Sequence, residues 1–338
     1  MVRYILAICL ILGLIFTSSS VPAETVTLKI GSHSSGKSYT ITNGLVPWCR
    51  AVEKDAGGTL KFQEFWGGQL SRSPEKQYEL MINGIQDATF VLPSYTQELF
   101  PDFSLFSLPY LFQNAAEGSR AMWRMYEKGL VGGLDKVYVV ALYNNGNSLL
   151  HFSKSIESGD DIKGLKIRAA GPDEAGVIKA MGAVPVGMAI TQVAESLNRG
   201  VIDGALCGWN PAQSFRFIPL IKTHYEEPLG VRTFFLGINK KVYDGLPEKA
   251  KQAIQKNTGI EVSGRMGDVV YDQDNDQLRK KALEDPKRNV ITVSGAEMDK
   301  RYNQIFKPFH DEWIKSTPDG QKKYDALMKI LADIRKGQ

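Results

Sequence analysis

The chain has 338 residues, with 41 Lys and Arg against 37 Asp and Glu, and a formal net charge of +4 at pH 7. This weak positive balance, without any tract of Lys or Arg, argues against nucleic acid as a partner. Only two of the three cysteines lie beyond the apolar N-terminal stretch, so a disulfide framework is excluded and buried thiols are expected. The histidines are scattered without zinc-ligand spacing, and we predict neither a metal site nor a cofactor.

The N-terminal residues are typical of a secretory signal peptide. Arg3 is the only charged residue before Glu24, residues 4–16 are almost wholly apolar, and a polar run leads into Val21-Pro22-Ala23. Small residues there favour cleavage after about Ala23, which makes residues 1–23 the leader of an exported, periplasmic protein. The apolar run is short for a bilayer span, and an uncleaved anchor is the alternative.

Strands and helices alternate in the first part of the chain. The predicted strands are 26–30, 60–65, 88–92 and 137–142. The predicted helices between them are 43–54 and 73–83, the second with Ser73 as its cap and Pro74 at its first position. This alternation indicates a largely parallel sheet, in which ligands bind beyond the carboxyl ends of the strands.

Residues 100–112 are aromatic, are interrupted by proline and show no clean period. We interpret this segment as a loop packed on the core, and as part of the wall of an apolar pocket in the alternative.

A second unit begins near residue 147. A strand ends at Arg168, a helix runs from Pro172 to Gly182, and a strand covers 183–188. A helix capped by Thr191 then runs to Gly200, and a strand follows at 233–239. Crossings near 143–147 and 230–236 predict two lobes joined by a double hinge.

The C-terminal part is predicted to be mostly helical. Residues 247–285 contain few helix breakers and predict one long kinked helix that braces both lobes. A strand at 290–293 and helices at 296–313 and 318–334 follow. The last helix has Thr317 as its expected cap and an apolar face formed by Leu327, Ile330, Leu331 and Ile334.

This organisation predicts two discontinuous lobes. Residues 24–146 plus about 233–265 are expected to form lobe I. Residues 147–232 plus about 266–338 are expected to form lobe II and the C-terminal helices.

Residues 31–38 read GSHSSGKS and match the phosphate-loop pattern G-x-x-x-x-G-K-[ST] after a predicted strand. Three observations argue against a nucleotide site. An exported chain meets little nucleotide, and no apolar run ends in an Asp that would hold magnesium. The residues after the motif, Tyr39 to Thr42, are also an unfavourable start for the helix that should follow. We therefore expect this segment to form the first β–α turn at the cleft, where His33 and Ser34 contact a ligand. A solvated loop position is the alternative for His33.

Arg168 is the principal candidate for a ligand contact. It ends a short apolar strand that contains Leu165 and Ile167. A guanidinium at a strand end can hold a carboxylate through two charge-assisted hydrogen bonds at the mouth of a sheet. The alternative is a structural ion pair with Asp173 or Glu174.

Further candidates surround the expected cleft. Ser94 and Asn145 are polar groups of the other lobe that would engage a ligand when the lobes close. Arg232 is a second possible cation, with a solvated hinge residue as the alternative. The aromatic candidates, for which core packing is the alternative in each case, are Trp66, Tyr95, Trp209 and Phe215. Two or more of them in the cleft would indicate an acid that carries a ring.

A series of short motifs occurs in a characteristic order between residues 26 and 310. They are Gly67-Gly68-Gln69-Leu70, Asn83-Gly84 with Asp87, Leu108-Pro109-Tyr110-Leu111-Phe112, Asn144-Asn145-Gly146, Leu165-Lys166-Ile167-Arg168, Met181-Gly182-Ala183-x-Pro185 and Gly200-Val201-Ile202-Asp203-Gly204. In these motifs the chain resembles the DctP-type extracytoplasmic solute-binding proteins of TRAP (tripartite ATP-independent periplasmic) transporters.

The resemblance implies an α/β, two-lobed periplasmic binding protein fold. Its expected parts are mixed sheets with flanking helices, an interdomain cleft and a long lobe-spanning helix. It also implies that Arg168 pairs with the ligand carboxylate and that Asn145, Trp209 and Asn210 lie in the cleft. Many members have Glu-Asn-Pro where this chain has Gly208-Trp209-Asn210-Pro211, which puts the role of Trp209 in doubt.

These observations predict a monomeric periplasmic receptor that binds a small organic carboxylate, with an aromatic acid as one option. It would deliver this ligand to the membrane subunits of a TRAP permease. A receptor linked to an ATP-cassette transporter is the nearest alternative, and an exported enzyme is a more distant one. The chain has neither G-x-S-x-G nor H-E-x-x-H, and Cys207 is expected to be a packed thiol rather than a nucleophile.

Overall fold

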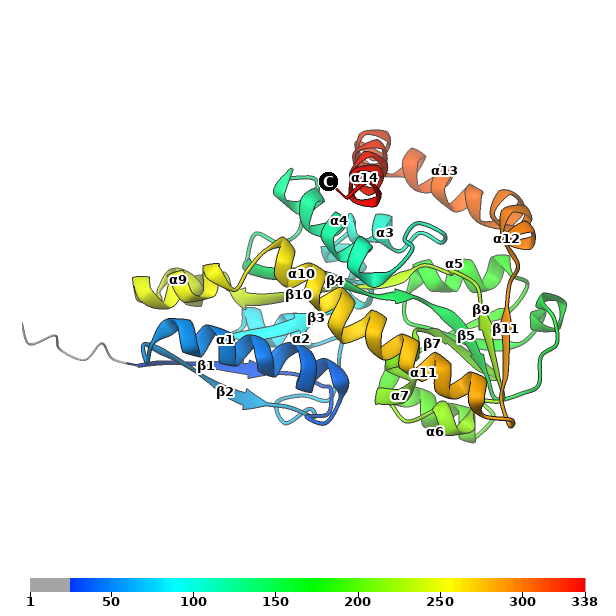
Figure 1. Cartoon of the computed structure of the whole chain (residues 1–338), viewed down its shortest axis with the longest axis horizontal. Helices are drawn as coiled ribbons and strands as arrows, with labels where there is room; N and C mark the ends of the chain where they lie inside the picture. Colours follow the sequence, from blue (N-terminus) through cyan, green and yellow to red (C-terminus); the bar gives the residue numbers. More distant parts are fainter. Residues whose placement is uncertain (1–24, 338) are drawn as a thin grey trace, which may run out of the picture.

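The computed structural model describes residues 25–337, and the predicted signal peptide lies outside them. Two β-sheets form two lobes that lie side by side, and helices flank both sheets (Figure 1). The predicted two-lobed α/β fold is therefore confirmed.

The first sheet has the strand order β2-β1-β3-β10-β4. Its strands are β1 (Val26–Gly31), β2 (Leu60–Phe65), β3 (Ala88–Val91), β4 (Val137–Asn147) and β10 (Val231–Asn239). β1 pairs in parallel with β2 and β3, whereas β10 runs antiparallel to β3 and β4. The sheet is mixed rather than largely parallel, because the chain re-enters it through β10 after passing through the second sheet.

The second sheet has the order β11-β9-β5-β8-β6-β7. Its strands are β5 (Leu149–Phe152), β6 (Lys166–Ala169), β7 (Val184–Gly187), β8 (Gly204–Cys207), β9 (Thr223–Glu226) and β11 (Asn289–Thr292). β6 pairs in parallel with β7 and β8, and β5 runs antiparallel to β8 and β9. Arg168 lies in β6, one residue before the strand ends.

Two chain crossings connect the sheets and are hydrogen-bonded to each other. β4 continues into β5 through Ser148, and β9 leads into β10 through residues 227–230. The Ser148 N–H donates to the Gly230 carbonyl at 2.7 Å, and the Leu229 N–H donates to the Ser148 carbonyl at 3.2 Å. The paired crossings form a narrow two-stranded connection, which is the geometry of a hinge.

The long helix that spans both lobes begins at Ile260, not near residue 247 as predicted. α9 (Glu248–Lys256) ends at Asn257, and Gly259 adopts a φ of 121°, which L-residues rarely tolerate. α10 (Ile260–Arg265), a π-helical segment (Met266–Asp272) and α11 (Gln273–Glu284) then form one run. In Figure 1 this run crosses from the first sheet to the second, and its ends pack against β4 and β11.

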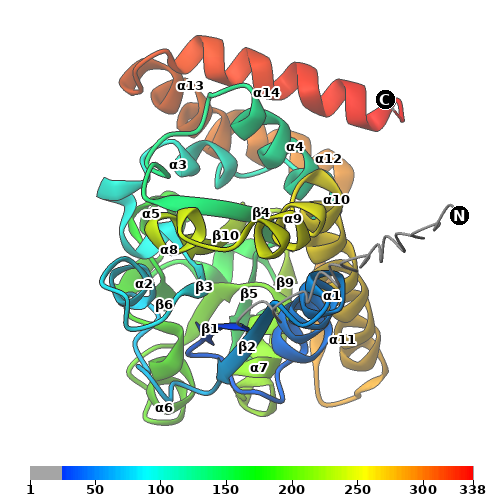
Figure 2. The ribbon, with the colours of Figure 1, turned by 90° about the vertical axis from the view of Figure 1, so that its left-hand side faces the viewer.

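The other helices cover the two sheets and the C-terminal end. They are α1 (Val46–Ala56), α2 (Gln77–Ile82), α3 (Phe103–Phe106), α4 (Ala115–Glu127), α5 (Pro172–Ala180), α6 (Val193–Asn198), α7 (Trp209–Ser214), α8 (Lys240–Asp244), α12 (Gly295–Arg301), α13 (Lys307–Ser316) and α14 (Gly320–Arg335). Figure 2 shows α14 lying over α4, and the two helices are in contact. No helix in residues 25–337 combines the length and apolar character needed to cross a bilayer.

Three predicted helix caps are wrong. α2 begins at Gln77, and the Ser73 hydroxyl donates to the Glu75 carboxylate instead of capping the helix. α6 begins at Val193, because residues 190–192 form a separate 3₁₀ turn that contains Thr191. α14 follows Asp319, and Thr317 instead ends α13.

The aromatic segment 100–112 packs on the core of the first lobe, as predicted. Phe100, Phe103 and Phe106 are buried around Phe235 of β10. Leu327, Ile330 and Leu331 of α14 close the same cluster, which confirms the predicted apolar face of the last helix. The segment therefore fills the space between β10 and α14, and it does not line the pocket between the two sheets.

Candidate ligand-binding site

A pocket lies between the two sheets, with about 540 Å³ of atom-free space that is partly open to solvent. Residues at the ends of strands from both sheets line it. His33 and Ser34 follow β1, Arg168 lies near the end of β6, and Cys207 ends β8. Carboxyl ends of parallel strands therefore face the pocket, which is where ligands bind in open α/β sheets.

Arg168 is fixed in position by protein oxygens. Its side chain is 2% exposed, its Nε donates to the Met188 carbonyl at 3.0 Å, and its Nη1 donates to the Leu206 carbonyl at 3.4 Å. Its Nη2 donates to the Tyr95 hydroxyl at 3.1 Å. Because each guanidinium nitrogen uses one donor, the remaining N–H groups of the two terminal nitrogens are oriented and available to an anion.

Glu174 lies between Arg168 and a second arginine. It forms an ion pair with Arg232, and its Oε2 lies 4.0 Å from Arg168 Nη1 and accepts the Ala170 N–H. The alternative role of Arg168, an ion pair with Glu174, is thus observed at a long distance. Asp173 instead accepts a hydrogen bond from Gln97 at 2.9 Å.

The lining side chains at this end of the pocket carry positive charge. Arg232 is 6% exposed, so the alternative of a solvated hinge residue is wrong. Burial, and then the nearby charge of Arg168, lower the pKa of Arg232 to about 9. Among the described residues, two guanidinium groups and no carboxylate line the pocket, while Glu174 and Asp173 act on Arg232 from behind it. An anion entering here would relieve the repulsion between the two cations.

Asn145 presents an unused donor beside these cations. Its Oδ1 accepts the Arg232 backbone N–H at 2.9 Å, and its carbonyl accepts a hydrogen bond from Asn275 Nδ2 at 3.0 Å. Its Nδ2 is buried, and nothing in residues 25–337 accepts from it. An unpaired buried donor costs free energy, and this amide is free to donate to an acceptor placed in the pocket.

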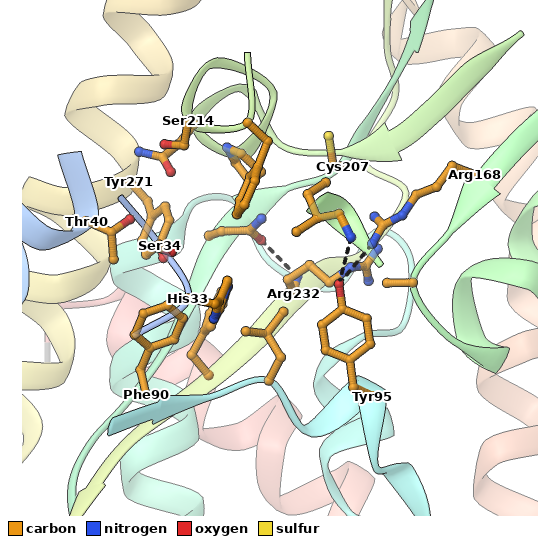
Figure 3. Close-up of a pocket in the computed structure, with 18 residues that line it drawn as sticks. His33, Ser34, Thr40, Phe90, Tyr95, Arg168, Cys207, Ser214, Arg232 and Tyr271 are labelled. Carbon is orange, nitrogen blue, oxygen red and sulfur yellow. Dashed lines mark hydrogen bonds between the residues drawn. The ribbon is translucent and has the colours of Figure 1, made fainter. Parts of the chain in front are cut away.

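Figure 3 shows the walls of the pocket, with Arg168, Arg232 and Tyr95 on one side and Thr40, Tyr271 and Ser34 on the other. Five aromatic rings line it: Phe90, Tyr95, Phe215, Phe234 and Tyr271. Two of the predicted aromatic candidates, Tyr95 and Phe215, are among them. Planar apolar walls of this kind suit a flat ligand.

Trp66 and Trp209 do not line this pocket. Trp66 is partly exposed beside Gly36, and its Nε1 donates to Glu64 at 2.8 Å. Trp209 turns away from the pocket into the second lobe and packs on His151 and His224, with ring centroids 5.4 and 4.2 Å away. Core packing, the alternative for Trp209, is what the structure shows.

Ser94 and Asn210, two predicted ligand contacts, lie against other protein groups. The Ser94 carbonyl lies so close to Gly171 that a Cβ there would be 2.6 Å away, and Ser94 does not line the pocket. Asn210 does line it, but its Nδ2 donates to Asp274 at 2.6 Å. Asn210 therefore ties α7 to the lobe-spanning helix as well as facing the cavity.

The first turn contributes a buried histidine. His33 is 9% exposed, so the solvated alternative is wrong. Burial lowers the pKa of His33 to about 4, which keeps the imidazole neutral at physiological pH. Ser34 is also buried, whereas Lys37, the residue that would contact phosphate in a nucleotide loop, is exposed and does not line the pocket.

Cys49 and Cys207 are buried free thiols, as predicted. Burial raises the pKa of Cys207 to about 12, so its thiolate is scarce near neutral pH. Residues 25–337 hold no group of three His, Cys, Asp or Glu arranged to bind a metal.

Several lining residues are not among the candidates predicted from the sequence. Phe90 and Phe234 lie in buried strands, and Tyr271 lies in the π-helical segment of the spanning helix. Strand alternation could have suggested the first two. Nothing local distinguishes Tyr271 from a core tyrosine, because only the packing of the helix across both lobes brings it to the pocket.

The sequence of residues 31–316 matches DctP, the bacterial extracellular solute-binding protein family 7. The C4-dicarboxylate-binding periplasmic protein DctP of Rhodobacter capsulatus is 24% identical over 309 residues, which cover 87% of this chain and 88% of that protein.

Two solved structures share the fold over nearly the whole chain. A TRAP solute-binding protein of Rhodoferax ferrireducens T118, crystallised with copurified benzoate, is 28% identical with a TM-score of 0.85, covering 92% of this chain and 99% of that chain. A marine metagenome TRAP solute-binding protein specific for aromatic acid ligands, crystallised with 3-hydroxybenzoate, is 24% identical with a TM-score of 0.86, covering 92% and 99%.

Proposed function

The chain belongs to family 7 of the bacterial extracellular solute-binding proteins, and we propose that it binds an aromatic monocarboxylate in the pocket between its lobes. One observation carries this proposal. Arg168 and Arg232 place two guanidinium groups at one end of a pocket that aromatic rings line.

The carboxylate would occupy the cationic end. Arg168 offers N–H donors from a guanidinium that is already held in place, and the Asn145 amide adds a neutral donor. Fixed, desolvated donors lose little entropy on binding, so a carboxylate held here contributes strongly to affinity.

A single carboxylate fits the charges better than two. Among the described residues that line the pocket, the cations are Arg168 and Arg232, and both lie at the same end, so a second carboxylate at the far end would be buried without a cation. An unpaired buried charge is costly. We therefore expect weak binding of succinate and other C4-dicarboxylates.

The aromatic rings that line the pocket are the reason to expect a ligand that carries a ring. Phe90, Phe215 and Phe234 line the pocket and would contact the faces or edges of a ring. The benzoate that copurified with the Rhodoferax ferrireducens protein, 28% identical over nearly the same length, supports this ligand class.

The ligand would close the receptor and pass unchanged to a membrane partner. We propose lobes at residues 24–146 plus about 233–265 and at 147–232 plus about 266–338, which rotate about the paired crossings. The mature protein would be a periplasmic monomer, cleaved after about Ala23, that delivers its ligand to the membrane subunits of a TRAP permease without catalysing a reaction on it.

Calorimetric titration of the purified mature chain tests the ligand class. We expect benzoate to bind in the micromolar range or tighter, about −8 kcal/mol or better. Succinate should bind at least about a hundredfold more weakly, and cyclohexanecarboxylate should fall between them because its ring is not flat. Tighter binding of succinate than of benzoate would overturn the proposal, and so would turnover of benzoate by the protein.

A further inference from the structure

The pocket has a second polar end that the carboxylate proposal does not use. His33, Ser34, Thr40 and Tyr271 lie on the side away from Arg168 and Arg232 in Figure 3. These side chains carry hydroxyl groups and an imidazole but no cation at neutral pH. The inference below rests on the proposed function and specifies its ligand further.

The His33 side chain has an unsatisfied buried nitrogen. No hydrogen bond within residues 25–337 reaches either ring nitrogen, and Nδ1 is fully buried. The Tyr271 side chain, by contrast, shares a hydrogen bond with Thr40. A buried imidazole without a partner costs free energy, and such groups usually meet a partner that binds.

The orientation of the imidazole is set by its aromatic neighbours. Its ring is nearly parallel to Phe215, with an interplanar angle of 12° and centroids 6.1 Å apart. It is tilted by 56° against Phe90, at 5.2 Å. A ring held against these faces presents its nitrogens at its edge, where they can reach a substituent in the plane of a neighbouring flat ligand.

We propose that His33 is a specificity residue that hydrogen-bonds a ring hydroxyl on the end of the ligand remote from the carboxylate. The preferred ligand class is accordingly a hydroxylated aromatic monocarboxylate. A neutral imidazole can accept the phenolic proton or donate to the phenolic oxygen, depending on its tautomer. A second carboxylate would not suit this end, because none of the lining residues there is a cation.

The position of the hydroxyl follows from the two-ended arrangement. An ortho hydroxyl lies next to the carboxylate and would stay at the guanidinium end. A meta or para hydroxyl points away from the carboxylate and towards the side of His33. The pocket is therefore expected to distinguish isomers that share the same formula and charge.

Calorimetric titration with benzoate and its 2-, 3- and 4-hydroxy derivatives tests the proposal. For the unmodified sequence we expect the 3- or 4-isomer to bind about tenfold more tightly than benzoate, and the 2-isomer to show no such gain. In His33→Phe, which keeps a ring against Phe215, this ratio should fall to about one. Lys37→Ala, an exposed change in the same turn, is the matched control and should leave the ratio unaltered.

A second measurement does not depend on a variant that folds. The nitrogen-15 resonances of the His33 ring should shift when the preferred hydroxybenzoate binds, and shift little with benzoate. An unchanged ratio in His33→Phe, or benzoate as the tightest ligand of the unmodified protein, would overturn the role of His33 while leaving the proposed function intact. Failure of every aromatic acid to bind would overturn both.

Discussion

The Tyr95 hydroxyl accepts a hydrogen bond from Arg168 Nη2 at 3.1 Å and another from the Ile190 N–H at 3.3 Å. Tyr95 follows β3 of the first sheet, whereas Arg168 lies in β6 of the second. One phenol therefore joins the two lobes and orients the proposed anion-binding guanidinium. The position of Arg168 and the closure of the lobes are linked through this contact.

Replacing Tyr95 by Phe should weaken benzoate binding about tenfold. A hydrogen bond to a charged group contributes about 1.5–3 kcal/mol, and its loss frees Arg168 and one contact between the lobes. Stopped-flow measurements should place most of the change in a faster dissociation rate, since the closed form is destabilised. Tyr126→Phe, a half-buried tyrosine far from the pocket, is the control. A Tyr95→Phe protein that releases benzoate no faster than the control would contradict the link.

Replacing Glu174 by Gln should make the ligand-free protein less stable and more responsive to ligand. Glu174 is 3% exposed and is the carboxylate in ion-pair distance of both Arg168 and Arg232. Its loss leaves buried guanidinium charge unpaired, which costs about 3 kcal/mol. Benzoate would then restore a negative charge, so the rise in Tm on binding should exceed that of the unmodified protein.

The matched control for this experiment is Glu117→Gln in α4. Glu117 is 5% exposed, forms an ion pair with Arg335, accepts the Gln113 N–H and does not line the pocket. Its replacement should leave the response to benzoate nearly unchanged. Equal increases of the benzoate-induced Tm shift in Glu174→Gln and Glu117→Gln would count against the role of Glu174 at the pocket.

Acidification should destabilise the folded chain through its buried histidines. The pKa of His33 falls from its ordinary 6.5 to about 4 through burial. Between pH 6.5 and pH 4 the His33 imidazole is protonated in the unfolded chain and neutral in the folded chain. The stabilising contribution is therefore complete above pH 6.5, decreases as the pH falls, and levels off below about pH 4. Each such histidine steepens the dependence by about 1.4 kcal/mol per pH unit.

Urea unfolding of the ligand-free protein at several pH values between 7.5 and 4.5 measures this slope. His33→Phe should reduce it by about 1.4 kcal/mol per pH unit in the middle of the range. A slope remains, because burial also lowers the pKa of His151 to about 3 and of His224 to about 2. An identical pH dependence in the variant would show that His33 is not held neutral.

The start of the lobe-spanning helix should depend on Gly259. Its φ of 121° is accessible to glycine and strained for other residues, although a Cβ would meet only Trp123 at 3.9 Å. Gly259→Ala should lower the free energy of unfolding by about 1–3 kcal/mol and leave benzoate affinity unchanged. Gly295→Ala, at the start of α12 with open space around it, should be neutral or mildly stabilising. Equal stabilities of the two variants would contradict the conformational explanation.

The strands were predictable because their apolar patterns are local. β1, β2 and β3 lie where the sequence predicts them, within one residue at each end. The failures share a different cause. Helix caps were predicted at Ser73, Thr191 and Thr317 because residues of these types often cap helices. In the structure turn residues follow each of them, so each helix begins later than predicted.

The site was predictable where it lies at strand ends and less so elsewhere. Arg168 and His33 follow from the rule that ligands gather beyond parallel strands. The position of Trp209 did not follow, because a short helix starting at that residue can turn its first side chain either to the cleft or to the core. The contact between Glu174 and Arg232 was also hidden, since it joins α5 to the start of β10, which are far apart in the sequence.

The most direct test of the central claim is the affinity of benzoate for Arg168→Ala compared with the unmodified chain, both shown to be folded by circular dichroism. Loss of a desolvated guanidinium opposite a carboxylate costs about 2–5 kcal/mol, so calorimetry should show binding weaker by about thirtyfold or more. A folded Arg168→Ala protein that binds benzoate as tightly as the unmodified chain would contradict the account.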